Sequence, residues 1–199
     1  FDYVPIEPPE SQGEKPKYGP DLLIPVTDVH TGELIQNAWN TYDNNIMRNR
    51  FYSYMTKIRE IQKLHGAVNA YVVLSELVSG LIHTTTRIES NENVIDQFLN
   101  AMNQVMWFLL QLSVIFTSVH VYVAPGNHSR LFPNKEDNRK GENLDNLALH
   151  YLGGYLQNVD NVYFHHNHID ESIALFEMQD GVTVASVHGD KDTPENVCR

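Results

Sequence analysis

Residues 118–130, SVHVYVAPGNHSR, decide the fold. The first half alternates β-branched and other side chains, which predicts a short buried strand over residues 119–125. This strand runs directly into Gly126-Asn127-His128, where the glycine permits a sharp backbone turn. Ligands of open α/β sheets bind outside the carboxyl ends of the strands. We therefore expect the amide of Asn127 and the imidazole of His128 to face a ligand.

Three further apolar runs end in polar side chains of the same kind. The runs at residues 22–26, 71–74 and 182–187 lead into Asp28 with His30, into Glu76 and into His188. The even spacing leaves room for a strand, a crossing helix and its loops in each interval. Carboxylate, imidazole and amide groups are therefore predicted to gather at one edge of a sheet.

Helices are predicted where apolar residues recur every three or four positions: residues 34–65, 91–116 and 144–156. The aromatic residues of the first helix, Trp39 among them, are expected to pack against the sheet. A short strand is expected at residues 161–165. The turn Gln179-Asp180-Gly181 predicts a hairpin between residues 173–178 and 182–187. Alternating strands and long helices define an α/β fold with a late antiparallel pair and a mixed sheet.

Composition sets the outer limits. The proline-rich residues 1–20 are interpreted as a linker or lead-in, and residues 21–199 as one domain. No apolar run approaches the roughly 18 residues of a membrane span, and the single cysteine, Cys198, excludes an internal disulfide framework. We therefore expect a cytoplasmic protein that does not associate with a membrane. The net charge of −11 argues against a broad electrostatic grip on DNA or RNA.

The motifs resemble those of the calcineurin-like metallophosphoesterases, whose signature is D-x-H, G-D, G-N-H, a lone His and G-H-x-H. Asp28-Val29-His30, Gly126-Asn127-His128 and His188 match the first, third and fourth motifs. Ser75-Glu76 stands where the family has Gly-Asp, and the closing motif is absent, so we expect the chain to stop before it. The resemblance covers residues 22–192. It implies an α/β/β/α sandwich with mixed β-sheets, incomplete at its C-terminal end.

The same resemblance implies a centre with two divalent cations. Its metal ligands would be Asp28, His30, Glu76, Asn127 and His188. Glu76 would bridge the two ions, although its extra methylene departs from the family's aspartate. His128 would be catalytic, contacting the phosphate or protonating the leaving oxygen. Manganese is the favoured metal, with iron, zinc and nickel as alternatives, because such ions clamp the attacking and leaving oxygens of a phosphate ester.

The expected reaction is hydrolysis of a phosphomonoester or phosphodiester, and nucleic acid is one candidate substrate because DNA-repair exonucleases share these motifs. Arg130 and His83 are candidate contacts to the substrate phosphate. The alternative is a catalytically impaired binding or assembly module of the same fold, which the altered Glu76 and the missing last motif favour. The histidines at 165, 166 and 168 form either a metal tract or a surface loop.

Overall fold

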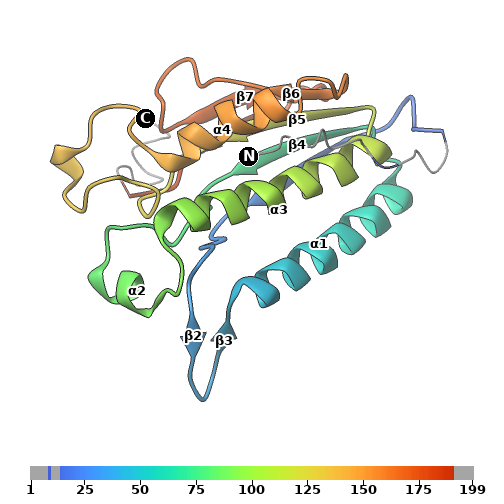
Figure 1. Cartoon of the computed structure of the whole chain (residues 1–199). Coiled ribbons are helices and arrows are strands. Elements are labelled where there is room, and N and C mark those ends of the chain that lie inside the picture. The colour runs from blue at the N-terminus through green and yellow to red at the C-terminus, as the bar shows by residue number, and fades with distance from the viewer. Residues whose placement is uncertain (1–8, 10–13, 191–199) are drawn as a thin grey trace.

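A four-stranded parallel sheet forms the centre of the protein (Figure 1). The computed structural model describes Pro9 and residues 14–190, so Cys198 and the end of the predicted domain lie outside the described residues. The strand order is β1 (Asp21–Val26), β4 (Asn69–Leu74), β5 (Ser118–Val123) and β6 (Val162–Phe164). The pairing is parallel throughout, so the carboxyl ends of all four strands lie at one edge. The prediction of a shared edge is confirmed for the first three motif-bearing strands, but residues 182–187 lie outside this sheet and β6 is its fourth strand.

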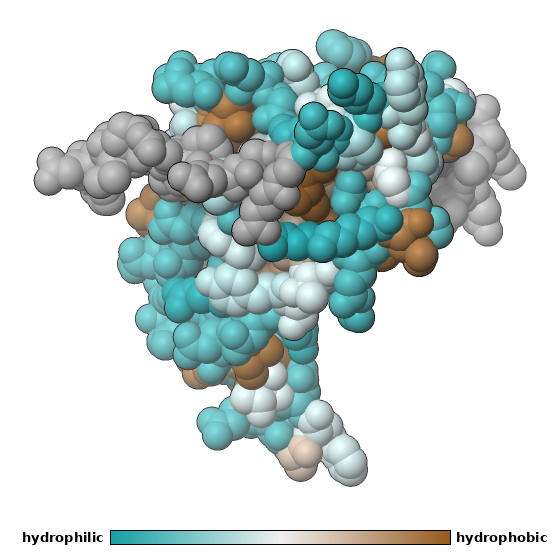
Figure 2. Space-filling model, turned by 90° about the vertical axis from the view of Figure 1, so that its right-hand side faces the viewer, coloured by the Kyte–Doolittle hydropathy of each residue, from teal (hydrophilic) through white to brown (hydrophobic). Residues whose placement is uncertain are grey.

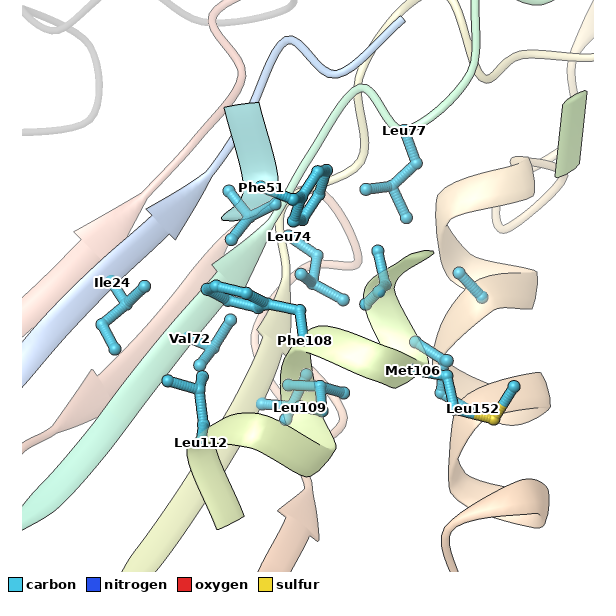
Figure 3. Close-up of a cluster of buried hydrophobic side chains, with 14 of the residues drawn as sticks. Ile24, Phe51, Val72, Leu74, Leu77, Met106, Phe108, Leu109, Leu112 and Leu152 are labelled. Carbon is cyan, nitrogen blue, oxygen red and sulfur yellow. The ribbon is translucent and has the colours of Figure 1, made fainter. Parts of the chain in front are cut away.

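One face of the sheet is covered by three helices: α1 (Asn44–His65), α3 (Val94–Ile115) and α4 (Leu144–Tyr155) (Figure 1). Their apolar sides meet the sheet in a continuous core, where Phe108, Leu109 and Leu112 of α3 are completely buried against Val72 and Leu74 of β4 (Figure 3). Apolar burial of this kind supplies most of the free energy of folding. The helical layer is therefore confirmed as the main support of the sheet.

Helix α3 is long and apolar enough to cross a membrane by length and composition alone. Its most apolar window is 61% buried inside the structure, as in the core helix of a soluble protein. Phe108 packs edge to face on Phe51 of α1 with ring centres 5.5 Å apart, which shows what covers this helix. The apolar composition of α3 is therefore explained by its position in the core.

The prediction of a helix from residue 34 is wrong for its first turns. Residues 34–43 contain instead the two short strands β2 (Ile35–Gln36) and β3 (Thr41–Tyr42), which pair antiparallel. Asn37 Oδ1 accepts the backbone N–H groups of Trp39 and Asn40, which turns the chain back on itself. Asp43 then caps α1 by accepting two N–H groups of its first turn.

The resulting hairpin projects from the body of the protein (Figures 1 and 2). Trp39 lies at its tip and is 95% exposed, so the expectation that it packs against the sheet is also wrong. The other end of α1 follows the prediction, because Gly66 adopts a left-handed φ of 66° and closes the helix. A further short helix, α2 (Thr84–Glu89), has no counterpart among the predicted elements.

The second face of the sheet carries the hairpin of β7 (Ala174–Glu177) and β8 (Thr183–Ser186), as predicted from its Asp-Gly turn. This hairpin is a separate two-stranded sheet, so the prediction of a mixed sheet is wrong: the central sheet is entirely parallel. Phe176 stacks on Tyr122 of β5 with ring centres 3.9 Å apart, which joins the two sheets. Helices, parallel sheet and hairpin thus form three layers, and residues 14–190 include no helix over the outer side of the hairpin.

A pair of histidines lies beside the stacked rings of Tyr122 and Phe176. His120 Nδ1 is 3.0 Å from His165 Nε2, and the His165 ring stacks on Tyr122. Burial lowers the pKa of both imidazoles, and the neighbouring histidines lower that of His165 further. The fold therefore disfavours the protonated form of both rings.

Truncation of the core at Phe108→Ala should lower the free energy of unfolding by about 3–5 kcal/mol, because it removes a buried ring and leaves a cavity. Urea denaturation followed by circular dichroism measures this loss. Trp39→Ala is the matched control, with an expected change within about 0.5 kcal/mol because that ring is exposed. Equal losses in the two variants would contradict the described core.

Stability should fall as the pH drops below about 6.5, the unperturbed pKa of histidine, because the unfolded chain then binds more protons than His120 and His165 do in the folded protein. The stability contributed by neutral imidazoles is present above that pH and lost below it. The double variant His120→Phe/His165→Phe should show a flatter dependence in urea titrations between pH 5 and pH 8. If stability depends on pH equally steeply in the double variant, groups other than His120 and His165 control this dependence.

Candidate metal centre

The loops that follow β1 and β4 are tied together by their backbones at the carboxyl edge of the sheet. The N–H groups of Val29 and His30 both donate to the carbonyl oxygen of Glu76, at 2.9 and 3.1 Å. The N–H of Thr31 donates to Leu77 O in the same way. These bonds hold the first two predicted motifs side by side.

Three of the predicted ligands occupy strained backbone conformations. Asp28, His30 and Glu76 have φ values of 53°, 46° and 51°, in the left-handed region that side chains disfavour. Each such residue costs on the order of 1–3 kcal/mol, and conformations of this kind cluster at functional sites. The side chains of these three residues lie near one another, with His30 Nε2 3.9 Å from Asp28 Oδ1 and 3.6 Å from Glu76 Oε2.

Glu76 lies at that point and is 1% exposed. Its Oε2 is 3.6 Å from His30 Nε2, and its Oε1 is 3.3 Å from His188 Nε2. On the first side, Asp28 Oδ1 lies 3.9 Å from the same nitrogen of His30. On the other side, Asn127 Oδ1 lies 2.7 Å from His188 Nε2. The two carboxylate oxygens of Glu76 therefore face two different groups of ligand atoms.

Glycine at position 126 makes this approach possible. A Cβ on Gly126 would lie 2.1 Å from Glu76 Oε1, so any larger residue would push the carboxylate away. A similar constraint holds on the far side of the loop, where a Cβ on Gly80 would lie 1.8 Å from the carbonyl oxygen of His128. Both loops pack against each other at backbone distance.

His128 reaches the centre with one nitrogen free. Its backbone N–H donates to Glu76 Oε1 at 2.8 Å, and its Nδ1 lies 2.9 Å from the carbonyl oxygen of Ser79. A carbonyl oxygen only accepts, so Nδ1 carries the proton and Nε2 remains available. The ring lies edge-on to His30 at 4.5 Å and beside His83 at 4.8 Å.

Within the described part of the chain, one trio of potential ligand atoms lies close enough together to hold an ion: His30, Glu76 and His128, all within 4.8 Å of one another. His128 is thus placed to act either as a ligand or as a proton carrier. The predicted tract of histidines does not converge in this way. His165 is bonded to His120, and His166 lies beside His150 with ring centres 5.0 Å apart.

Asp145 is the residue of the centre that the sequence did not reveal, since its position suggested only the start of a helix. Its carboxylate is completely buried in the first turn of α4. It accepts the backbone N–H groups of Glu76, Leu77 and Gly126 at 2.9–3.1 Å and the hydroxyl of Ser129 at 2.7 Å. Burial raises the pKa of Asp145, while these four hydrogen bonds act in the opposite direction.

Arg130 lies directly behind the centre and is 8% exposed. Its backbone N–H and its Nε both donate to the carbonyl oxygen of Asn127, at 3.2 and 3.1 Å. His83 sits more openly, at the start of α2, with its ring against His128. All eight predicted site residues therefore lie at the same edge of the sheet.

Comparisons of the chain with protein-family models, with curated proteins and with solved structures found no match in any of the three. The family resemblance therefore depends on the sequence motifs alone.

The substitution Asp145→Asn should lower the free energy of unfolding by about 2–4 kcal/mol, because the amide nitrogen would face N–H donors and leave some of them unpaired. Chemical denaturation in the absence of metal measures this effect. Asp160→Asn, in the exposed turn before β6, is the matched control and should change stability by less than about 0.5 kcal/mol. A loss as small as the control's would show that the loops do not need this carboxylate.

Proposed function

We propose that the protein is a metal-dependent phosphoesterase that hydrolyses a phosphomonoester or phosphodiester at a two-cation centre. The observation that carries the proposal is the position of Glu76. One of its oxygens faces His30 and Asp28, and the other faces His188 and Asn127. A buried carboxylate between two sets of ligand atoms is the arrangement that a bridging ligand requires.

The residues fit divalent cations in spacing and in chemistry. Two atoms bound at about 2.1 Å to one cation at a right angle lie about 3 Å apart. The separations of 3.3 and 3.6 Å from Glu76 to the two imidazoles are close to this value. His30 turns its Nε2 toward Asp28 and Glu76, while its Nδ1 lies 3.9 Å from Glu33 Oε2 on the other side of the ring. Carboxylate, amide and imidazole donors suit manganese, with iron, zinc or nickel as alternatives.

Each residue then has a defined role. Asp28, His30, Glu76, Asn127 and His188 would hold the cations, which supply charge for the transferring phosphoryl group and lower the pKa of bound water. His128 is held through Nδ1 by Ser79 and presents Nε2 to the substrate. There it would hydrogen-bond a phosphate oxygen or deliver a proton to the leaving oxygen. The side chain of Asp28 is 72% exposed, so the centre opens to solvent on that side.

The geometry of the centre fits both phosphomonoesters and phosphodiesters. Nucleic acid is one candidate, although the net charge of −11 disfavours a broad nucleic-acid surface. A cytoplasmic location agrees with the single cysteine of the chain. His83 and Arg130 would contact the substrate phosphate.

A binding or assembly module is the second candidate function. The trio of His30, Glu76 and His128 favours it, because these three side chains alone can hold one ion. His128 would then be a ligand and could not serve as a proton donor. The two functions differ in metal stoichiometry, with two ions per chain for the enzyme and one for the module.

Manganese-dependent hydrolysis of bis(p-nitrophenyl) phosphate and of p-nitrophenyl phosphate tests the proposal. We expect His128→Ala to lower kcat by about 10²–10⁴-fold, the usual contribution of a positioned acid or base. Asp28→Ala should lower activity by weakening one cation, which equilibrium dialysis detects as a lost ion. His150→Ala, which removes an exposed histidine outside the centre, is the matched control and should leave activity unchanged.

Activity that survives in His128→Ala would remove the proposed role of that residue. No activity, together with fewer than two bound ions per chain, would contradict the enzyme and favour the binding module.

A further inference from the structure

A cavity of about 610 Å³ opens beside the candidate metal centre. Its wall begins at Pro125 and Gly126, at the start of the loop that carries Asn127 and His128. Four of the 14 lysines and arginines of this acidic chain line it: Arg130, Lys135, Arg139 and Lys140. Such a gathering of cations next to a phosphate-ester centre suggests a place for a second anion.

Arg130 provides the most informative contact. Its Nε–H donates a hydrogen bond to the carbonyl oxygen of Asn127, and this bond fixes the guanidinium plane relative to the centre. Its Nη1 is buried and has no hydrogen-bond partner in the part of the chain that the structure describes. A buried guanidinium nitrogen without an acceptor is costly, and a phosphate oxygen is the acceptor that a guanidinium group fits best.

Lys135 and Asp190 complete this end of the cavity. Asp190 Oδ2 lies 3.8 Å from Arg130 Nη1 and 3.6 Å from Lys135 Nζ, beyond hydrogen-bond distance of both, and Lys135 Nζ donates instead to the backbone carbonyl oxygen of Asp190. Among the described residues, these two cations therefore share one carboxylate at ion-pair distance. Asp190 occupies the position that an incoming anion would take.

The rest of the wall carries charges of both signs. Lys140 pairs with Asp170 at 3.6 Å, and the backbone N–H of Arg139 donates to Glu142. Glu171 adds a further negative charge to this part of the wall. An anion is therefore favoured at Arg130 and Lys135 and disfavoured beyond them.

We infer that Arg130 and Lys135 form a seat for a second phosphate group, next to the one that is hydrolysed. The inference rests on the proposed phosphoesterase and narrows its substrate to a compound with two neighbouring phosphates, such as an oligonucleotide or a polyphosphate. The second phosphate accepts hydrogen bonds from Arg130 Nη1 and Lys135 Nζ and displaces the carboxylate of Asp190. The rest of the substrate extends along the cavity.

Calorimetric binding of thymidine 3′,5′-bisphosphate and of thymidine 5′-monophosphate to the full chain with manganese tests this seat. We expect the bisphosphate to bind at least about tenfold more tightly, the size of one charge-assisted hydrogen bond. Lys135→Ala and Arg130→Lys should each reduce this preference to about threefold or less. Asp190→Asn should increase it, because it removes the competing carboxylate. Lys57→Ala, an exposed lysine of α1, is the matched control and should leave the preference unchanged.

Equal affinities of the unmodified protein for the two nucleotides would overturn the second-phosphate seat. A preference that Lys135→Ala leaves intact would do so as well, and this exposed residue can be removed even if Arg130→Lys disturbs folding. Hydrolysis of bis(p-nitrophenyl) phosphate in the same preparation tests the phosphoesterase separately, because that ester has no second phosphate. Competition by tripolyphosphate or by a short oligothymidylate then identifies the source of the two phosphates, and either result supports the seat.

Discussion

The buried carboxylate of Asp145 is the contact on which the arrangement of the centre depends. It joins the backbone of Glu76 and Leu77, after β4, to the backbone of Gly126 and the hydroxyl of Ser129, after β5. A charge in a completely buried position is tolerated only where hydrogen bonds replace its water. The same requirement keeps both ligand loops in one geometry, because moving either loop would leave the carboxylate unsatisfied.

That rigidity explains how the backbone strain persists. Asp28, His30 and Glu76 keep left-handed conformations, which ordinary loops would relax. The cross-loop bonds from Val29 and His30 to Glu76 O and the close approach at Gly126 leave the chain no room to do so. The free energy for this strain comes from the apolar core of α3 and the parallel sheet.

The candidate metal centre and the adjoining cavity favour ligands of opposite charge. The protein carries a net charge of −11, and its ligand cluster is rich in carboxylates that suit cations. Behind it, Arg130 and Lys135 share one acidic partner and suit an anion. Opposite preferences at neighbouring positions fit a substrate whose phosphates bridge a metal and a cationic seat.

Much of the fold and most of the candidate site could be predicted from the local sequence. The strands, the long α3, the Gly66 cap and the Asp-Gly hairpin follow from periodicity and turn chemistry. The candidate ligands after β1, β4 and β5 could be grouped because carboxyl ends of parallel strands meet at one edge of a sheet, whereas His188 reaches them from the separate hairpin. These features depend on neighbours in the chain or on a general rule of topology.

Two other features could not be predicted, for different reasons: local side-chain hydrogen bonds override the helical spacing before α1, and Asp145 depends on contacts between distant parts of the chain. The residues before α1 have an apolar spacing that suits a helix, yet side-chain bonds from Asn37 and Asp43 make a hairpin there and leave Trp39 in solvent. The role of Asp145 depends on hydrogen bonds that its carboxylate accepts from two other loops. The sequence by itself determined the alternation of strands and helices and the kinds of ligand at the strand ends. Only the tertiary structure decided which oxygen of Glu76 faces which imidazole, because that depends on how separate loops pack.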